Sequence, residues 1–189
     1  MVTLRSPARP DARTGQALFP LIAVTALIYM AIVFLTVRPY GGNVSAMIGA
    51  WSPLVKAHRG VVGHRVVVFR DSGYDGFTYY VVAGNPFLGQ SVYRDAFRSQ
   101  RIGYPVAVAI ASLGRLAWRP AAMVAVNLIS VLAIAYLAGL ILLDVGRDAR
   151  VWLALVCAVN PSLIIGVQRD LAELLMTALA LGGLLLFLR

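Results

Sequence analysis

About five apolar runs, separated by polar segments, dominate the hydrophobicity pattern of this chain. An α-helix needs about 20 apolar residues to cross a hydrocarbon core of about 30 Å. The run from Ala17 to Val37 meets this length and carries no charged side chain. The pattern therefore predicts an all-α, polytopic transmembrane helical bundle, with spans at 17–37, 102–118, 121–143, 151–167 and 171–188.

The polar segments divide the chain further. Residues 1–16 form a basic N-terminal tail, and 17–189 form a single membrane domain. The long segment 38–101 is rich in Gly, Pro, Arg and Tyr, and is predicted to be an extramembrane loop. Asn160-Pro161 interrupts one apolar run, and proline must kink or break the helix because it removes a backbone hydrogen bond.

Composition agrees with a membrane location, because 60% of the residues are hydrophobic and only 13% are charged. The net charge of +9 comes almost entirely from arginine, since Lys56 is the single lysine. These arginines occur at membrane edges and in the loop, so membrane lipid or a phosphorylated ligand is the expected partner rather than nucleic acid. The lone Cys157 excludes an intrachain disulfide.

The predicted location is the inner (plasma) membrane, with several crossings. Arg5, Arg9 and Arg13, together with Arg115 and Arg119, favour a cytoplasmic amino terminus and an extracytoplasmic loop 38–101. The sequence ends directly after an apolar run, so a truncated chain is expected.

The most informative part of the loop runs from Asp71 to Phe87. Its spacing predicts a short helix that begins at Asp75 and ends before Asn85-Pro86. Asp75 and Tyr79 share one face at i,i+4 spacing, and the opposite face is apolar. Such a helix is expected to lie in the membrane interface.

Held there, the Asp75 carboxylate has the chemistry of a general base or a divalent-cation ligand, either of which suits group transfer from a lipid phosphate. The structural alternative is that Asp75 is only a helix N-cap. Asp71 is better explained as a turn residue.

Two further polar clusters adjoin the apolar runs. Arg94, Arg98 and Arg101 precede the run at 102–118, where their guanidinium groups match phosphate oxygens or, alternatively, form an arginine belt for ordinary head groups. The second cluster, Arg169 to Glu173, follows Asn160-Pro161. Ionisable groups near membrane depth tend to be functional, although an Arg169–Asp170 pair capping the last helix is a simpler reading.

In chain order, the motifs read Tyr-Asp-Gly-x-x-Tyr-Tyr-x-x-Ala-x-Asn-Pro-Phe from Tyr74, Gln-Arg-Ile-x-Tyr-Pro from Gln100, and Asn-Pro-x7-Arg-Asp-x-x-Glu from Asn160. From about Ala17 onward the chain resembles bacterial multi-spanning proteins of the GT-C glycosyltransferase superfamily, related to the mannosyltransferases of the GPI-anchor pathway. Members of that family are roughly twice as long.

This resemblance implies a polyprenyl-phosphate-linked sugar as donor and a carboxylate beside the membrane. It implies that Asp75 is the base or metal-associated carboxylate, that Arg98 and Arg101 contact the donor phosphate, and that Glu173 is a supporting polar group. Tyr79 and Arg94 are further expected substrate contacts. No cofactor is identified beyond a possible divalent cation, for which Asp75 would be the ligand.

If every apolar run crosses once, Glu173 lies on the side opposite Asp75, whereas the resemblance requires both near one cavity. Either the Pro161 segment re-enters without crossing, or Glu173 does not belong to the site. The leading functional hypothesis is a GT-C-like glycosyltransferase acting on an extracytoplasmic acceptor. The alternative is a non-enzymatic membrane protein, such as a transporter subunit or a lipid-binding partner, with its site at the helix break.

Overall fold

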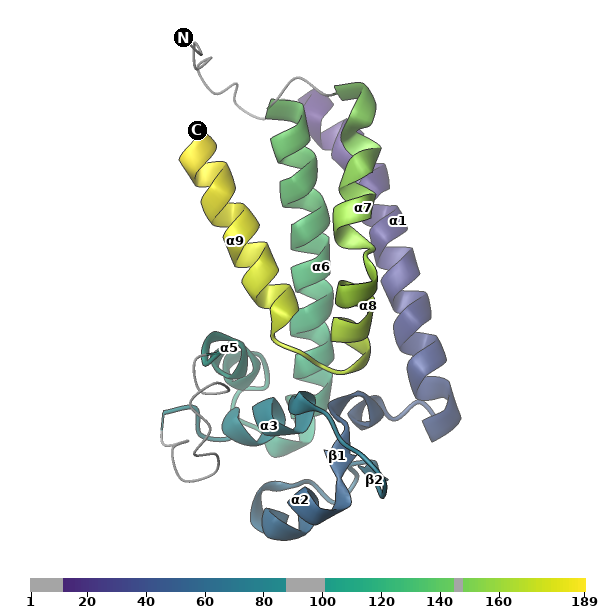
Figure 1. Ribbon diagram of the computed structural model, residues 1–189, viewed down its shortest axis with the longest axis vertical. Coiled ribbons are helices and arrows are strands. Elements are labelled where there is room, and N and C mark those ends of the chain that lie inside the picture. The colour runs from purple at the N-terminus through teal and green to yellow at the C-terminus, as the bar shows by residue number, and fades with distance from the viewer. Residues whose placement is uncertain (1–11, 88–100, 145–147) are drawn as a thin grey trace.

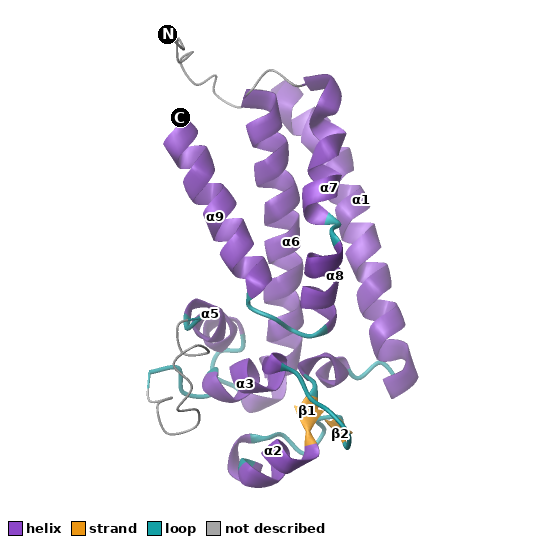
Figure 2. Ribbon diagram, viewed as in Figure 1, coloured by secondary structure: helices purple, strands orange, loops and turns teal. Residues whose placement is uncertain are grey.

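The computed structural model describes residues 12–87, 101–144 and 148–189, and this part of the chain is mostly helical (Figures 1 and 2). The α-helices are α1 (Ala12–Val37), α2 (Ser52–Ala57), α3 (Asp75–Val82), α5 (Gly103–Ala111), α6 (Arg119–Asp144), α7 (Ala154–Ala158), α8 (Pro161–Gln168) and α9 (Glu173–Leu188). The 3-10 helices are η1 (Arg38–Tyr40), η2 (Val44–Ile48), η3 (Arg59–Val61), η5 (Leu116–Trp118) and η6 (Asp148–Leu153). Two short parallel strands, β1 (Ala50–Trp51) and β2 (Val68–Phe69), pair within the loop region.

The long helices form an up-and-down bundle (Figure 1). Helix α1 runs toward the end that carries the loop, α6 returns, α7 and α8 together run back toward the loop, and α9 returns again. Two segments, Leu18–Tyr40 and Leu116–Asp144, are long and apolar enough to cross a membrane, and the bent α7–α8 pair makes a third candidate. Helix α9 is apolar but has only 16 residues.

The outer surface of the bundle is apolar, as expected of helices that face lipid. On α1, Phe19 is 72% exposed and Leu27 is 70% exposed. Soluble monomers rarely expose continuous apolar surface of this kind, so these side chains favour a membrane environment.

The predicted crossing at 102–118 is not present. Helix α5 has nine residues and spans about 14 Å, roughly half of a hydrocarbon core. It ends in a turn where Leu113 and Gly114 have positive φ angles of 51° and 69°. Because α5 lies at the loop end of the bundle, the chain enters α6 from the same end at which it left α1 (Figure 1).

This topology corrects two expectations. The start of α6, with Arg119, lies at the loop end, so Arg115 and Arg119 cannot mark the side of the amino terminus. The α8–α9 turn that carries Glu173 also lies at the loop end. The conflict between Asp75 and Glu173 disappears because 102–118 does not cross.

The predicted break at Asn160-Pro161 is confirmed, with a bend of 50° between α7 and α8. Proline at the first position of α8 has no N–H to donate to the carbonyl of Cys157. The Asn160 side chain replaces that bond by donating from Nδ2 to Cys157 O at 2.8 Å. Its Oδ1 accepts from the backbone N–H of Leu163 at 3.1 Å and so caps α8.

Two apolar cores hold the fold together. The first lies inside the bundle and includes Leu21, Ile134 and Leu174. The second joins the loop region to α5 and to the base of α6, through residues such as Phe77 and Met123. The described loop residues of this core, from Ile48 to Ala83, are therefore packed against the bundle instead of standing apart from it.

The first prediction concerns the helix break. Asn160→Ala removes both the α8 cap and the bond to Cys157 O, and we expect it to lower the free energy of unfolding by about 1–2 kcal/mol. Unfolding in detergent, followed by circular dichroism, measures this loss. Ser162→Ala, at the exposed neighbouring position of α8, is the matched control and should have little effect. Equal stability of the two variants would contradict the assigned role.

Candidate functional site

Asp75 is the first residue of α3, so a helix occupies the segment where the spacing predicts one. The N-cap position is taken by Tyr74, whose backbone is extended and whose side chain makes no capping bond. Asp75 is therefore not the N-cap. Its carboxylate lies in the first helical turn, where the positive end of the helix dipole favours negative charge.

Helix α3 does not present an apolar face to the membrane interface, which corrects the amphipathic interpretation. Phe77 and Tyr80 on the expected lipid-facing side are fully buried, and so is Tyr79 on the opposite side. The reason is tertiary packing, since η2, α5 and α6 all contact α3. The aromatic residues fill the second core and hold Asp75 against the bundle.

Gly76 makes a close contact between α3 and the α8–α9 turn. A Cβ atom at this position would lie 2.5 Å from the carbonyl oxygen of Arg169 and 2.8 Å from that of Ile48. Both are backbone atoms of packed segments, so no larger residue fits. The Asp75-Gly76 pair is thereby fixed directly beside the Arg169-Asp170 pair.

The turn itself depends on Asp170. This residue has a positive φ of 48° and is completely buried. Its Oδ1 accepts a hydrogen bond from Asn127 Nδ2 at 3.2 Å, and the same amide donates to the hydroxyl of Tyr104 at 3.0 Å. Three segments, α5, α6 and the α8–α9 turn, are joined by these bonds.

Burial raises the pKa of the Asp170 carboxyl well above its usual range, and the Asn127 amide offsets this only in part. The Oδ2 atom has no hydrogen-bond partner among the described residues. A buried carboxyl group with one unpaired oxygen and no cation beside it is most stable in the protonated form.

Arg169 and Asp170 do not pair to cap α9. The Arg169 guanidinium is instead stacked over the ring of Tyr74, with its Cζ 4.4 Å from the ring centroid. The N-cap of α9 is Ala172, which makes no side-chain capping bond. The capping interpretation of this turn is therefore wrong, and the turn is held by contacts to α3 and α6.

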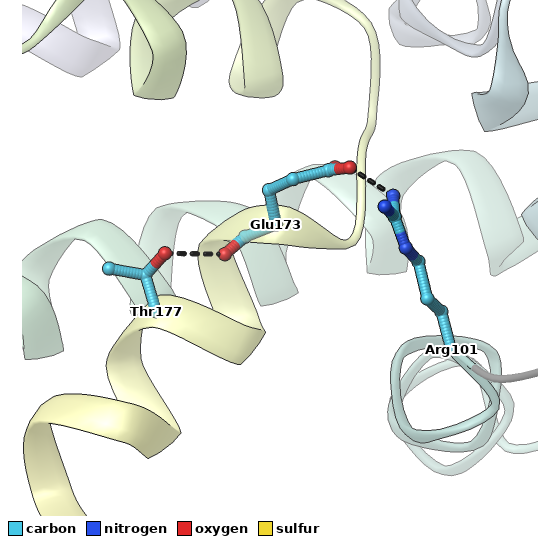
Figure 3. Close-up of polar contacts among 3 residues, drawn as sticks. All are labelled: Arg101, Glu173 and Thr177. Atoms are coloured by element: carbon cyan, nitrogen blue, oxygen red, sulfur yellow. Dashed lines mark hydrogen bonds and ion pairs between the residues drawn. The ribbon is translucent and has the colours of Figure 1, made fainter.

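Arg101, two residues before the start of α5, forms an ion pair with Glu173 in the first turn of α9 (Figure 3). The Glu173 carbonyl also accepts a hydrogen bond from Thr177 at 2.8 Å. Burial raises the pKa of the Tyr79 phenol, and the neighbouring Arg101 guanidinium opposes that rise. Tyr79 also packs edge-on against Tyr104, at 5.5 Å between ring centroids.

The structure thus brings four predicted site residues, Asp75, Tyr79, Arg101 and Glu173, to one end of the bundle. Arg94 and Arg98 lie outside the described residues. Within the ranges that are described, no group of three His, Cys, Asp or Glu side chains is arranged to hold a metal ion. A cation at Asp75 would therefore need ligands from its substrate, from water or from elsewhere in the chain.

Asn127 and Asp170 were not among the predicted site residues. Asn127 is the only amide in the apolar run 121–143, which is the signal that could have identified it. A single amide in a long apolar run indicates a buried polar partner, because an unpaired amide is costly there. The sequence indicates Asp170 only as a member of the polar cluster 169–173 and as a partner for Arg169, and not as the partner of Asn127.

Asp170 yields a pH prediction. The folded protein retains the Asp170 proton to a higher pH than the unfolded chain, whose carboxyl titrates near 3.8. The folded state binds more protons in that window, so Asp170 lowers stability as the pH rises from about 4 toward its raised pKa. Asp170→Asn keeps the shape, tolerates the positive φ and should remove this pH dependence.

Melting temperatures of the wild type and of Asp170→Asn, measured at pH 4.5 and pH 7.5, test this effect. The melting temperature of Asp170→Asn, relative to that of the wild type, should be higher at pH 7.5 than at pH 4.5. Asp144→Asn, at the opposite end of the bundle, is the control, because Asp144 is paired with Arg189 near the surface. If the melting temperature of the wild type instead rises relative to that of Asp170→Asn between pH 4.5 and pH 7.5, Asp170 is ionised in the folded protein.

The Arg101–Glu173 pair yields a second prediction. Its side chains are 23% and 37% exposed, so solvent screens the interaction and we expect a coupling of about 0.5–1 kcal/mol. A double-mutant cycle with Arg101→Gln and Glu173→Gln, read by unfolding in detergent, measures it. No measurable coupling would indicate that the ion pair does not hold α5 to α9.

Comparison of this chain with protein-family models, with curated proteins and with solved structures gave no match. The function is therefore inferred from the sequence motifs and from the geometry of the cluster.

Proposed function

We propose that this protein is a membrane glycosyltransferase of the GT-C type, which transfers a sugar from a polyprenyl-phosphate donor to an extracytoplasmic acceptor. One observation carries the proposal. Three motif segments, separated by up to about 100 residues in the sequence, meet at one end of an apolar helical bundle. A carboxylate, an arginine and two tyrosines are gathered where a lipid-linked donor would present its phosphate.

In this proposal Asp75 is the general base. Its carboxylate accepts the proton of an acceptor hydroxyl as that oxygen attacks the anomeric carbon of the donor sugar. The bond from this carbon to the phosphate oxygen breaks, and polyprenyl phosphate leaves with the electron pair. A single displacement of this kind inverts the anomeric configuration. A divalent cation held by Asp75 is the alternative use of the same carboxylate.

The surrounding residues hold Asp75 and the substrate. Gly76 fixes the start of α3 against the α8–α9 turn, and Glu173 orients the Arg101 guanidinium through the ion pair. Tyr79 lies next to Arg101 on the face shared with Asp75, within reach of a common substrate. Arg94 and Arg98 remain proposed phosphate contacts.

A transporter is less well supported, because two backbone carbonyls at the helix break already accept hydrogen bonds from the protein. The carbonyl of Ala158 accepts a hydrogen bond from the Tyr29 hydroxyl at 2.6 Å, and that of Cys157 accepts from Asn160. Transporter sites at broken helices use such freed backbone groups to bind ions or substrates. Here these two carbonyls are bonded to Tyr29 and Asn160 instead.

In the structure, arginines near the ends of the candidate spans lie at both ends of the bundle. The distribution of positive charge therefore does not orient the chain, and an extracytoplasmic loop is proposed from the family resemblance alone.

The test is the change Asp75→Asn. Asparagine keeps the size of the side chain but does not accept a proton at neutral pH, so we expect transfer to fall by about 10²–10⁴-fold. Release of polyprenyl phosphate from radiolabelled polyprenyl-phosphate mannose and polyprenyl-phosphate glucose, in membranes containing the protein, measures the reaction without knowledge of the acceptor.

Asp71→Asn is the matched control, since Asp71 is an exposed residue of the same loop, and it should leave transfer unchanged. Expression level and melting temperature of both variants exclude a folding defect. Unchanged donor turnover by stable Asp75→Asn protein would contradict the proposed role of Asp75.

A further inference from the structure

Arg119, the first residue of α6, is buried at 7% exposure. Its Nε and Nη1 atoms have no hydrogen-bond partner among the described residues, and no carboxylate pairs with its guanidinium in that part of the chain. Its Cζ lies 5.7 Å from the ring centroid of Tyr80, which is a contact with an aromatic face and not a charge partner. A buried guanidinium without an anion is costly, so this environment favours binding of one.

The other described arginines of this region differ from Arg119. Arg101 is paired with Glu173, and Arg169 is exposed and stacked on Tyr74. Arg115 is exposed and lies over Trp118, with its Cζ 4.6 Å from the ring centroid. Arg119 is thus the arginine of this group that combines burial with unpaired N–H donors.

Gly84 lies directly over this guanidinium. It is an exposed residue just after α3, and a Cβ atom there would lie 2.7 Å from Arg119 Nη1 and 3.0 Å from Nη2. The absence of a side chain at Gly84 therefore leaves the guanidinium directly beneath the surface. Arg119 is also the first residue of the 26-residue helix α6, and the positive end of the helix dipole adds to the attraction for an anion.

We propose that the Arg119 guanidinium, at the start of α6, forms a phosphate-ester binding site, which takes the phosphate of a lipid at the surface beside Gly84. Guanidinium forks match two phosphate oxygens at once, and Tyr80 holds the plane of this fork in place. The site is adjacent to the Asp75 cluster, because Tyr79 and Tyr80 are consecutive residues of α3 that contact Arg101 and Arg119 respectively.

Identification of that lipid as the sugar carrier rests on the proposed function, whereas the anion site itself does not. The same phosphate chemistry is offered by a polyprenyl phosphate, by phosphatidylglycerol and by inorganic phosphate. Binding of each to the full chain in phosphatidylcholine nanodiscs, without any turnover, separates the three sources.

We expect Arg119→Gln to weaken binding of long-chain polyprenyl phosphate by about tenfold or more, as loss of a charged hydrogen-bonding group implies. Arg115→Gln is the matched control. It removes an equal charge four residues away and should change the affinity by less than about threefold, because exposed charges contribute little.

A second variant keeps the charge and guards against a folding defect. Gly84→Ala places a methyl group against the guanidinium and should also weaken binding, whereas Gly60→Ala, at a glycine with open space around it, should not. If Arg119→Gln and Gly84→Ala both lower the affinity for one of the three ligands, that ligand is the occupant of the site. Unchanged affinity of both variants for all three would overturn the proposal.

A loss of binding in these variants, together with unchanged donor turnover in Asp75→Asn, would leave a lipid-phosphate site on a protein that lacks the proposed catalytic base. Unchanged lipid binding in these variants, together with loss of donor turnover in Asp75→Asn, would support the proposed enzyme and contradict the Arg119 site. The two experiments therefore fail independently.

Discussion

The packing of Gly76 against the Arg169-Asp170 turn is the contact on which the arrangement at the loop end depends. It brings the backbone of α3 against two carbonyl oxygens, and the adjacent Asp170 is buried by the same contact. A buried carboxyl group needs a hydrogen-bond donor, and Asn127 from α6 provides it. One close approach thus joins the loop, the α8–α9 turn and helix α6, and it holds Asp75 at the edge of the cluster.

Much of the fold could be predicted from hydrophobicity, because the spans at 17–37 and 121–143 are long uninterrupted apolar runs. The break at Asn160-Pro161 follows from the missing N–H of proline. The prediction of a membrane span at 102–118 is wrong because hydropathy reports apolar character and does not report where a helix ends. Its side chains, such as Val108, fill the core between the loop and α6, which from sequence alone cannot be distinguished from a lipid-facing surface. That single error reversed the expected side of the α8–α9 turn.

The site could be predicted only in part. Asp75, Tyr79, Arg101 and Glu173 occur in polar segments where a functional role is easily suspected, and they do converge. Asn127 and Arg119 could not be predicted as site residues because their roles depend on neighbours that are distant in the sequence. Asn127 is meaningful once Asp170 is seen beside it, and Arg119 resembles an ordinary membrane-edge arginine until its burial and unpaired donors are known. A pattern along one chain does not contain this information.

The central claim is that the loop and the α8–α9 turn lie on the same side of the membrane, with the carboxyl end of α9 on the other. Single cysteines introduced at Ser72, Gln168 and Arg189, in a chain whose native Cys157 is replaced by serine, test it directly. All three positions are exposed, so a membrane-impermeant maleimide applied to sealed vesicles reports their side. Labelling of positions 72 and 168 from one side and of position 189 from the other is the predicted result. Labelling of 72 and 168 from opposite sides would contradict the account.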